Sequence, residues 1–244
     1  MTPGPVAESI LPLEFDSVGY AVGGRALLRE LSFRLEPGLR TLILGPNGAG
    51  KSLTLRLAHG LIRPSAGSVR WHGVAPERDR RRQVMVFERP VLLRRSVLAN
   101  MEYALALQSV PRRTRRGVAL EFLRKTGLEA LAHRAARVLS AGEQQRLAIA
   151  RAWATEPEVL LLDDPTAALD PGAARSVEEL IGAVAGSGTR IVMTTHDLAQ
   201  ARRLADEVLF FDRGRLLEHA RADVFFDRPG SDRARAFLRG EPMW

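Results

Sequence analysis

The sequence predicts an α/β fold: a mainly parallel sheet with flanking helices, an N-terminal antiparallel β-part and an inserted helical part. Two observations support this prediction. Short apolar runs alternate with helical patterns on both sides of a central stretch, which is typical of a parallel sheet, and the central stretch itself is mostly helical. We expect one domain over residues 1–244, with the antiparallel part at about 10–40, the core at 41–89 and 155–244, and the helical part at about 90–154.

The first part of the chain shows strand patterns and then a strand that leads into a helix. LEFDSVGYAV and LLRELSFRLEPG alternate apolar and polar residues on either side of Gly23 and Gly24, which predicts a small antiparallel sheet. The run RTLILG enters a Gly-rich turn, and SLTLRLAHGLI beyond it has helical periodicity. Strand, loop and helix in this order form half of a βαβ unit.

Helical patterns dominate from about Pro90 to Ala154, and strands return afterwards. EVLLLDD, RIVMTTHD and EVLFFDRGRLLE are predicted strands, separated by helical stretches. The chain contains neither internal repeats nor low-complexity tracts.

Composition favours a soluble, cytoplasmic protein. No run approaches the ~18 uninterrupted apolar residues of a membrane span, and the first residues lack the pattern of a signal peptide. Because the chain has no cysteine, it can form neither a disulfide framework nor a thiolate metal site.

The formal net charge of +8 comes from scattered arginines, with Lys51 and Lys125 the only lysines. The densest basic cluster, PRRTRRG at 111–117, is interpreted as a solvated loop or helix face; the alternative is a contact with lipid headgroups or an acidic partner. No aromatic residues interleave with this cluster, so nucleic acid is not an expected partner.

The stretch GPNGAGKS fits the P-loop motif G-x-x-x-x-G-K-[ST] and lies between a predicted strand and a predicted helix, as the mechanism of that motif requires. Its glycines let backbone N–H groups turn toward phosphate oxygens at a helix N-terminus, its lysine reaches the β- and γ-phosphates, and its serine hydroxyl can ligate Mg²⁺. We expect nucleotide binding by Gly45, Pro46, Asn47, Gly48, Ala49, Gly50, Lys51, Ser52 and Leu53.

Two aspartates follow the apolar run VLLL. Asp163 ends a predicted buried strand, where α/β sheets place ligand groups, and we expect it to hold Mg²⁺ directly or through water. A capping or turn aspartate is the alternative, which Pro165 makes plausible. Asp164 then faces the space beyond the γ-phosphate, as a candidate base or orienter for the attacking water.

The stretch LSAGEQQRLAIARA has two compatible interpretations. Ser140 and Glu143 form a capping box at the start of an amphipathic helix. A capped helix N-terminus, with Gly142 permitting close approach, is also an anion site, and it is not needed for the nucleotide that Lys51 holds. It would suit a phosphate presented by another copy of the protein.

These residues resemble the ATP-binding cassette (ABC) ATPases, specifically the nucleotide-binding subunits of bacterial importers. GPNGAGKS, LSAGEQQR, VLLLDD, AALD and TTH follow the family's order and spacing, and the resemblance covers nearly the whole chain. It implies a P-loop NTPase core with an inserted helical signature subdomain, ATP and Mg²⁺ as cofactors, and a homodimer.

The resemblance also implies roles for single residues. Tyr20 would stack on adenine, Glu88 would occupy the loop that links nucleotide to permease, and His196 would contact the γ-phosphate. Taken alone, Tyr20 is a half-buried strand aromatic and His196 a satisfied strand-end histidine. In a dimer, the signature residues would contact the γ-phosphate bound by the opposite subunit, and Asp170 would cross the dimer interface. The residues expected to contact the nucleotide of the opposite subunit are Ser140, Ala141, Gly142, Glu143 and Asp170.

The chain departs from the family where Glu88 replaces the usual Gln and Asp164 the usual Glu. Both changes lie on the water and Mg²⁺ side of the nucleotide, and a carboxylate at Glu88 can itself ligate Mg²⁺. The expected metal ligands are therefore Ser52, Glu88 and Asp163, and the expected catalytic residues Asp164, His196 and Glu88. Ala141 and Ala168, which replace a glycine and a serine, are milder changes.

The sequence thus predicts a transport-coupled ATP hydrolase, slowed by Asp164 and Glu88, at the cytoplasmic face of the inner membrane. Its partners would be integral membrane permease subunits and, indirectly, a substrate-binding protein. PVLLRRSVLANM, Pro90 to Met101, is the predicted docking surface, and the cargo most resembles tungstate or another oxyanion. The alternatives are an ATP-binding switch with impaired hydrolysis and a soluble ABC ATPase without a transport role.

Overall fold

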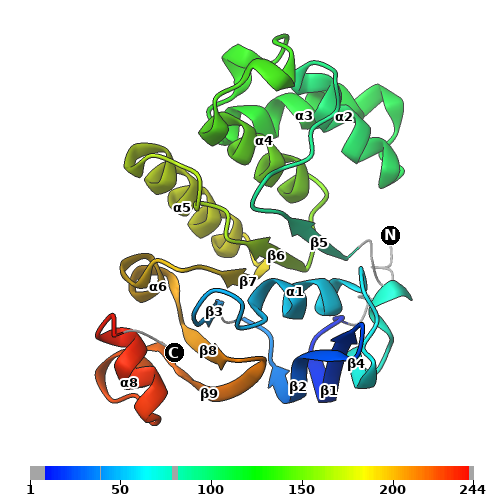
Figure 1. Ribbon diagram of the computed structural model, residues 1–244. Coiled ribbons are helices and arrows are strands. Elements are labelled where there is room, and N and C mark those ends of the chain that lie inside the picture. The colour runs from blue at the N-terminus through cyan, green and yellow to red at the C-terminus, as the bar shows by residue number, and fades with distance from the viewer. Residues whose placement is uncertain (1–8, 39, 79–81, 242–244) are drawn as a thin grey trace.

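The computed structural model describes residues 9–38, 40–78 and 82–241. Its strands form a three-stranded sheet and a six-stranded sheet. Helices α2, α3 and α4 gather at one end of the molecule and the three-stranded sheet lies at the other (Figure 1). No helix in the described residues is long and apolar enough to cross a membrane.

The smaller sheet has the order β2-β1-β4, and both neighbouring pairs are antiparallel. Its strands are β1 (Leu13–Val22), β2 (Arg25–Leu35) and β4 (Ala66–Trp71). The first two match the predicted antiparallel part. Strand β4 corrects the prediction, because it comes from the range 41–89 that the sequence assigned to the core.

The larger sheet has the order β5-β6-β7-β3-β8-β9 and is parallel from β5 to β8. Its strands are β5 (Gln83–Val86), β6 (Val159–Asp163), β7 (Arg190–Thr194), β3 (Thr41–Leu44), β8 (Glu207–Asp212) and β9 (Arg215–Arg221). Strands β3, β6, β7 and β8 are buried along their whole length, which explains their continuous apolar runs. The mainly parallel sheet with a separate antiparallel sheet confirms the predicted fold class.

The stretch EVLFFDRGRLLE is two antiparallel strands, β8 and β9, and not one strand as predicted. The chain reverses at Arg213 and Gly214, whose φ angles are 47° and 77°. Two residues with positive φ form the tight turn that matches the twist of a hairpin.

Helices cover both faces of the larger sheet. Alternate residues of its strands belong to two apolar clusters, one shared with the smaller sheet and α1, the other with α5, α7 and α8. The helices of the core are α1 (Lys51–His59), α5 (Pro171–Gly186), α6 (Leu198–Leu204), α7 (Ala222–Asp227) and α8 (Asp232–Leu238).

The helical part has an apolar cluster of its own. It contains α2 (Val97–Leu107), α3 (Arg112–Lys125) and α4 (Ala141–Trp153). Helix α4 joins this part to the core, because Leu147 and Ala150 pack in the helical cluster while Ala148 and Ile149 pack in the cluster of the larger sheet. The start of α4 is therefore fixed relative to the carboxyl ends of the sheet strands.

Candidate nucleotide site

The predicted phosphate-binding residues 45–53 form the loop between β3 and the start of α1. A Cβ on Gly45 would lie 2.1 Å from the carbonyl oxygen of Phe211, so only glycine allows this approach to β8. Helix α1 begins at Gly50 without a side-chain cap and has no acidic residue in its first turn. Its N-terminal N–H groups are thus left for an anion.

Lys51 lies over this loop with its side chain half-buried. Its Nζ donates to the carbonyl oxygens of Gly45 and Pro46, at 2.7 and 3.0 Å. Burial lowers the pKa of Lys51, and the carboxylates of Asp164 and Asp163 oppose that shift. An ammonium that donates to carbonyl oxygens in a partly desolvated position is suited to exchange those partners for phosphate oxygens.

Ser52 and Asp163 meet at the carboxyl end of β6. The Ser52 hydroxyl donates to Asp163 Oδ1 at 2.7 Å, and the same oxygen accepts from the Thr194 hydroxyl at 3.0 Å. A hydroxyl and a buried carboxylate are hard oxygen donors of the kind that Mg²⁺ prefers, so the residues present fit this ion. No cluster of three or more acidic or histidine side chains able to hold a metal occurs in the described part of the chain.

Asp164 and His196 form a pair beside this point. Their Oδ2 and Nδ1 atoms are 2.6 Å apart, and with Asp164 ionised the Nδ1–H of His196 donates. Asp164 Oδ1 is buried and lacks a hydrogen-bond partner among the described residues. Burial raises the pKa of Asp164 and the charge of Glu88 adds to this, while His196 opposes it.

Glu88 and Tyr20 lie at the edges of the site. Glu88 is exposed after the end of β5, and it is close enough to Asp164 for its charge to act on that carboxyl. Tyr20 is half-buried on β1 opposite Leu28, and a Cβ on Gly50 would meet Leu28 Cδ2 at 2.3 Å. Leu28 thus lies between Tyr20, its strand partner, and Gly50 of the phosphate loop.

The signature residues are organised by their own helix. Ser140 Oγ accepts from the Glu143 N–H at 3.3 Å and Glu143 Oε2 accepts from the Ser140 N–H at 2.8 Å, so the predicted capping box is confirmed. Ala141 beside it is exposed. Gly142 is buried, and a Cβ there would lie 2.7 Å from the Cβ of Ala173 on α5. Its lack of a side chain therefore serves packing within the chain.

Asp170 caps α5. Its Oδ1 accepts from the N–H groups of Gly172 and Ala173, both at 3.0 Å. The structure thus brings together Lys51, Ser52, Asp163, Asp164 and His196. Asp170 and the Ser140–Glu143 capping box instead make hydrogen bonds within the starts of α5 and α4. Their contact with a nucleotide on another copy remains a prediction.

Three residues near the site were not predicted from the sequence. Thr194 bridges the two aspartates, as described below. Gln145 of α4 is buried and donates to the carbonyl oxygen of Phe87 at 3.4 Å, and Arg151 of α4 donates to that of Val91 at 3.0 Å. Polar side chains on the apolar side of a helix were the available signal for the last two.

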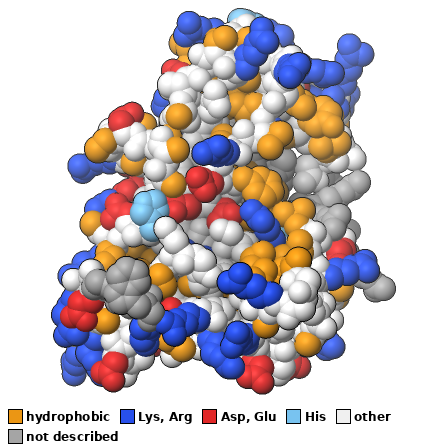
Figure 2. Space-filling view, viewed as in Figure 1, with side chains coloured by type: hydrophobic (Ala, Val, Ile, Leu, Met, Phe, Trp, Pro, Cys, Tyr) orange, Lys and Arg blue, Asp and Glu red, His pale blue; other side chains and the backbone are white. Residues whose placement is uncertain are grey.

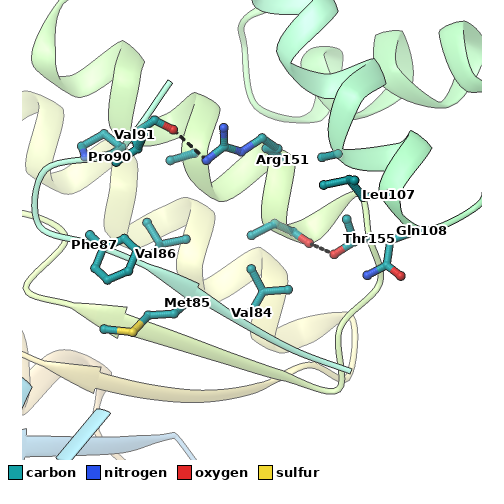
Figure 3. A pocket seen from close by; sticks show the side chains of 13 residues that line it. Val84, Met85, Val86, Phe87, Pro90, Val91, Leu107, Gln108, Arg151 and Thr155 are labelled. Atoms are coloured by element: carbon teal, nitrogen blue, oxygen red, sulfur yellow. Dashed lines mark hydrogen bonds between the residues drawn. The ribbon is translucent and has the colours of Figure 1, made fainter. Parts of the chain in front are cut away.

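A groove of about 390 Å³ lies between β5, the loop after it, α2 and α4 (Figure 3). Val84, Met85 and Val86 line it from the sheet, and Leu107 and Arg151 from the helices. Burial lowers the pKa of Arg151.

The groove coincides with only part of the predicted docking surface. Of Pro90 to Met101, only Pro90 and Val91 line it, while Val97, Leu98 and Met101 are buried in the helical cluster. That stretch contains the start of α2, where Val97, Leu98 and Met101 pack inward on α3 and α4, so these three side chains are not available to a partner.

A second cleft, of about 670 Å³, opens beside His196 between α5 and α6. Both charge signs line it, with Glu178, Glu179 and Asp197 against Arg175 and Arg203. Figure 2 shows acidic side chains gathered beside a histidine at the middle of one face, with Lys and Arg side chains above and below. The carboxylates are thus concentrated near the site, and the basic residues are spread around it.

A family model described as ABC transporter matches residues 28–167. The tungstate uptake system ATP-binding protein TupC of Peptoclostridium acidaminophilum is 38% identical over 205 residues, covering 84% of this chain and 94% of that protein. The uncharacterized amino-acid ABC transporter ATP-binding protein YhdZ of Escherichia coli K12 is 34% identical over 241 residues, covering 95% of both.

Among solved structures, the chain resembles cbiO1 from Clostridium perfringens, described as part of the ABC transporter complex cbiONQ. The TM-score is 0.81 at 27% identity, and the match covers 91% of this chain and 92% of that chain.

Proposed function

Because the chain belongs to the ABC transporter family of ATP-binding proteins, as its motifs indicated, we propose that it binds and hydrolyses Mg-ATP as the ATPase subunit of a bacterial importer. The observation that carries this proposal is the meeting of Lys51, the Ser52–Asp163 contact and the Asp164–His196 pair at one end of the parallel sheet. An ammonium that can bind phosphates, oxygen atoms that can ligate a metal and a carboxylate that can orient a water molecule lie side by side there.

In this mechanism the chain mainly positions its substrate. The N–H groups at the start of α1 and the Lys51 ammonium bind the phosphates, and Tyr20 offers its ring to the base. Ser52 and Asp163 would hold Mg²⁺, which supplies positive charge to the β- and γ-phosphates when bound.

Hydrolysis then needs a group that handles water. Asp164 orients the water and takes its proton as the water oxygen bonds to the γ-phosphorus and the bond to the β–γ bridging oxygen breaks, which releases ADP and phosphate. The hydrogen bond between His196 Nδ1 and the Asp164 carboxylate holds the two side chains together, and an N–H at Nε2 would donate to the γ-phosphate. We expect slow turnover, because aspartate is one methylene, or roughly 1.5 Å, shorter than glutamate.

The test is nucleotide binding and phosphate release by the purified chain. Lys51→Ala should abolish turnover and weaken ATP binding, and Tyr20→Ala should weaken binding with a smaller effect on kcat. Wild-type affinity in both variants would refute the assignment of this site. If binding depends on Lys51 but no phosphate is released, the chain is an ATP-binding switch and not a hydrolase.

The import function requires a membrane partner, and we place its contact at the groove beside β5. The support is an apolar lining with Val91 and Leu107 exposed to 72% and 61% at its rim. Val91→Asp should abolish co-purification with a co-expressed permease, whereas Val224→Asp, at an exposed valine on α7, should not. Equal co-purification of both variants would exclude this groove.

Tungstate or a related oxyanion is the proposed cargo, and the similarity to a tungstate uptake subunit supports it. Because other subunits select the cargo, the experiment is uptake in cells that express the whole gene cluster, with tungstate, phosphate and amino acids in competition. Uptake of amino acids without uptake of any oxyanion would contradict the proposal that the cargo is an oxyanion.

A further inference from the structure

Thr194 carries a buried hydroxyl at the end of a strand whose three preceding residues are apolar. It ends β7, is 1% exposed and follows Ile191, Val192 and Met193. Valine has nearly the same shape, so packing alone does not need the hydroxyl, and a buried hydroxyl is unfavourable unless it is hydrogen-bonded. The two hydrogen bonds that it makes therefore indicate its role.

Both of these hydrogen bonds go to the aspartates of the site. Thr194 Oγ1 accepts from the backbone N–H of Asp164 at 2.9 Å and donates to Asp163 Oδ1 at 3.0 Å. The parallel register sets Asp163 opposite Thr194 and so fixes this geometry. One hydroxyl thus binds both the carboxylate of Asp163, the expected metal ligand, and the backbone of Asp164, the residue expected to orient water.

The backbone of Asp164 needs such a partner. Asp164 follows the last residue of β6 and has a φ of 44°, a conformation that few residues other than glycine adopt. Its N–H lies beyond the end of the strand, and the Thr194 hydroxyl is the acceptor that the structure shows for it. Without this hydrogen bond the backbone of Asp164 would be less fixed, and its short carboxylate would be poorly oriented toward the attacking water.

We infer that Thr194 is a positioning residue, which aims the Asp164 carboxylate at the attacking water and fixes Asp163 and Ser52 for Mg²⁺. The inference rests on the proposed ATPase function. It implies that loss of the Thr194 hydroxyl lowers kcat and weakens the effect of Mg²⁺ on nucleotide binding, in addition to any change in the stability of the fold.

The test compares Thr194→Val, Thr194→Ser and the control Thr189→Val. Thr189 is also a buried threonine, beside the other end of β7, and its hydroxyl donates only to Pro157, at 3.0 Å, among its described contacts. We expect Thr194→Val to lower kcat about tenfold and to raise the KM for Mg-ATP only about threefold, in step with the weaker effect of Mg²⁺ on binding. Thr194→Ser should stay within about threefold of wild type, and Thr189→Val should lose stability only.

The second readout is the ratio of ATP affinities with Mg²⁺ and with EDTA. It should shrink at least about threefold in Thr194→Val and stay constant in Thr194→Ser and Thr189→Val. If the wild-type protein binds ATP but never hydrolyses it, the proposed function fails. The affinity ratio would then still test whether the Thr194 hydroxyl supports the magnesium site. Wild-type kcat and ratio in Thr194→Val, or no rescue by serine, would overturn the inference. Thr194→Ala replaces the valine variant if that one does not fold, with losses in the same direction.

Discussion

Asp164 combines three costs at one residue. Its φ is 44°, its Oδ1 is buried without a partner in the described structure, and burial raises its pKa. Features of this kind persist only where the surrounding structure holds them, and they concentrate at functional sites. The cost is understandable if the free Oδ1 is the atom that meets water once a nucleotide is bound.

The first prediction is that Asp164→Glu raises turnover. The longer side chain restores reach, and a misplacement of ~1 Å can lower a rate about 10²-fold, so an increase of roughly tenfold is expected. Glu88 acts on Asp164 through its charge, so its effect should be coupled to this change. A cycle of Asp164→Glu, Glu88→Gln and the double variant, followed by steady-state phosphate release, measures both.

The contrary outcome is specific. An unchanged rate in Asp164→Glu, together with full activity in Asp164→Asn, would show that Asp164 does not handle the water. Additive effects of the two substitutions would show that Glu88 and Asp164 act independently of each other.

At the scale of elements, the sequence predicted best what depends on local pattern. Strand β3, the phosphate loop and α1 follow from an apolar run, glycines and a helical period, and the Ser140 cap from its spacing to Glu143. Strand β4 was missed because its pairing with β1 depends on a partner about 50 residues away in sequence. Part of the predicted docking surface is buried, because periodicity does not tell whether the apolar residues at the start of α2 face a partner or their own domain.

A polar network joins the amino ends of β3, β7 and β8 to the carboxyl-terminal part of β9. Glu207 of β8 accepts from Thr41 of β3 at 2.5 Å, from Arg190 of β7 at 2.7 Å and from His219 of β9 at 3.0 Å. Burial would raise the pKa of Glu207, but these hydrogen bonds outweigh it and lower that pKa to about 2.

The second prediction concerns this network and pH. A depressed folded pKa gives stability that is fully present above the unfolded value near 4.5 and is lost as pH falls toward about 2. Glu207→Gln should therefore lower the free energy of unfolding by roughly 2–3 kcal/mol at pH 7, with a difference that shrinks between about pH 4.5 and 2. Urea unfolding at several pH values measures it. Glu179→Gln, in an exposed pair with Arg175, should change stability by less than about 1 kcal/mol, and an equal loss in both variants would refute the network's role.

The third prediction concerns the contact of α4 with α5. Glycine to alanine in a helix usually stabilises by up to about 1 kcal/mol. Gly142→Ala should instead destabilise by about 1–3 kcal/mol, because the new Cβ would meet that of Ala173 at 2.7 Å. Gly182→Ala, in α5 with nothing within 4 Å of the added carbon, should show the ordinary gain. Thermal unfolding of both variants decides, and stabilisation by Gly142→Ala would show that α4 and α5 separate easily.

At the scale of the whole molecule, the two helix starts expected to meet phosphates differ in their caps. The start of α1 has no side-chain cap, whereas the start of α4 is capped by its own residues. Helix N-termini attract anions, and the exposed Ser140 and Ala141 leave this one open. Two copies arranged head to tail would place each α4 start against the nucleotide of the other copy.

The last prediction is that this arrangement forms with ATP and depends on Ser140. In an Asp164→Asn background, which should retain ATP, sedimentation with Mg-ATP is expected to show a dimer and sedimentation without nucleotide a monomer. Ser140→Arg should abolish the dimer, because the arginine would fill the space that a phosphate of the other copy needs. Since that change also removes a helix cap, worth about 1 kcal/mol, the control is Ser231→Arg, which removes the cap of α8 in the same way. A dimer that survives Ser140→Arg, or one that Ser231→Arg removes equally, would show that the start of α4 does not meet the nucleotide of a second copy.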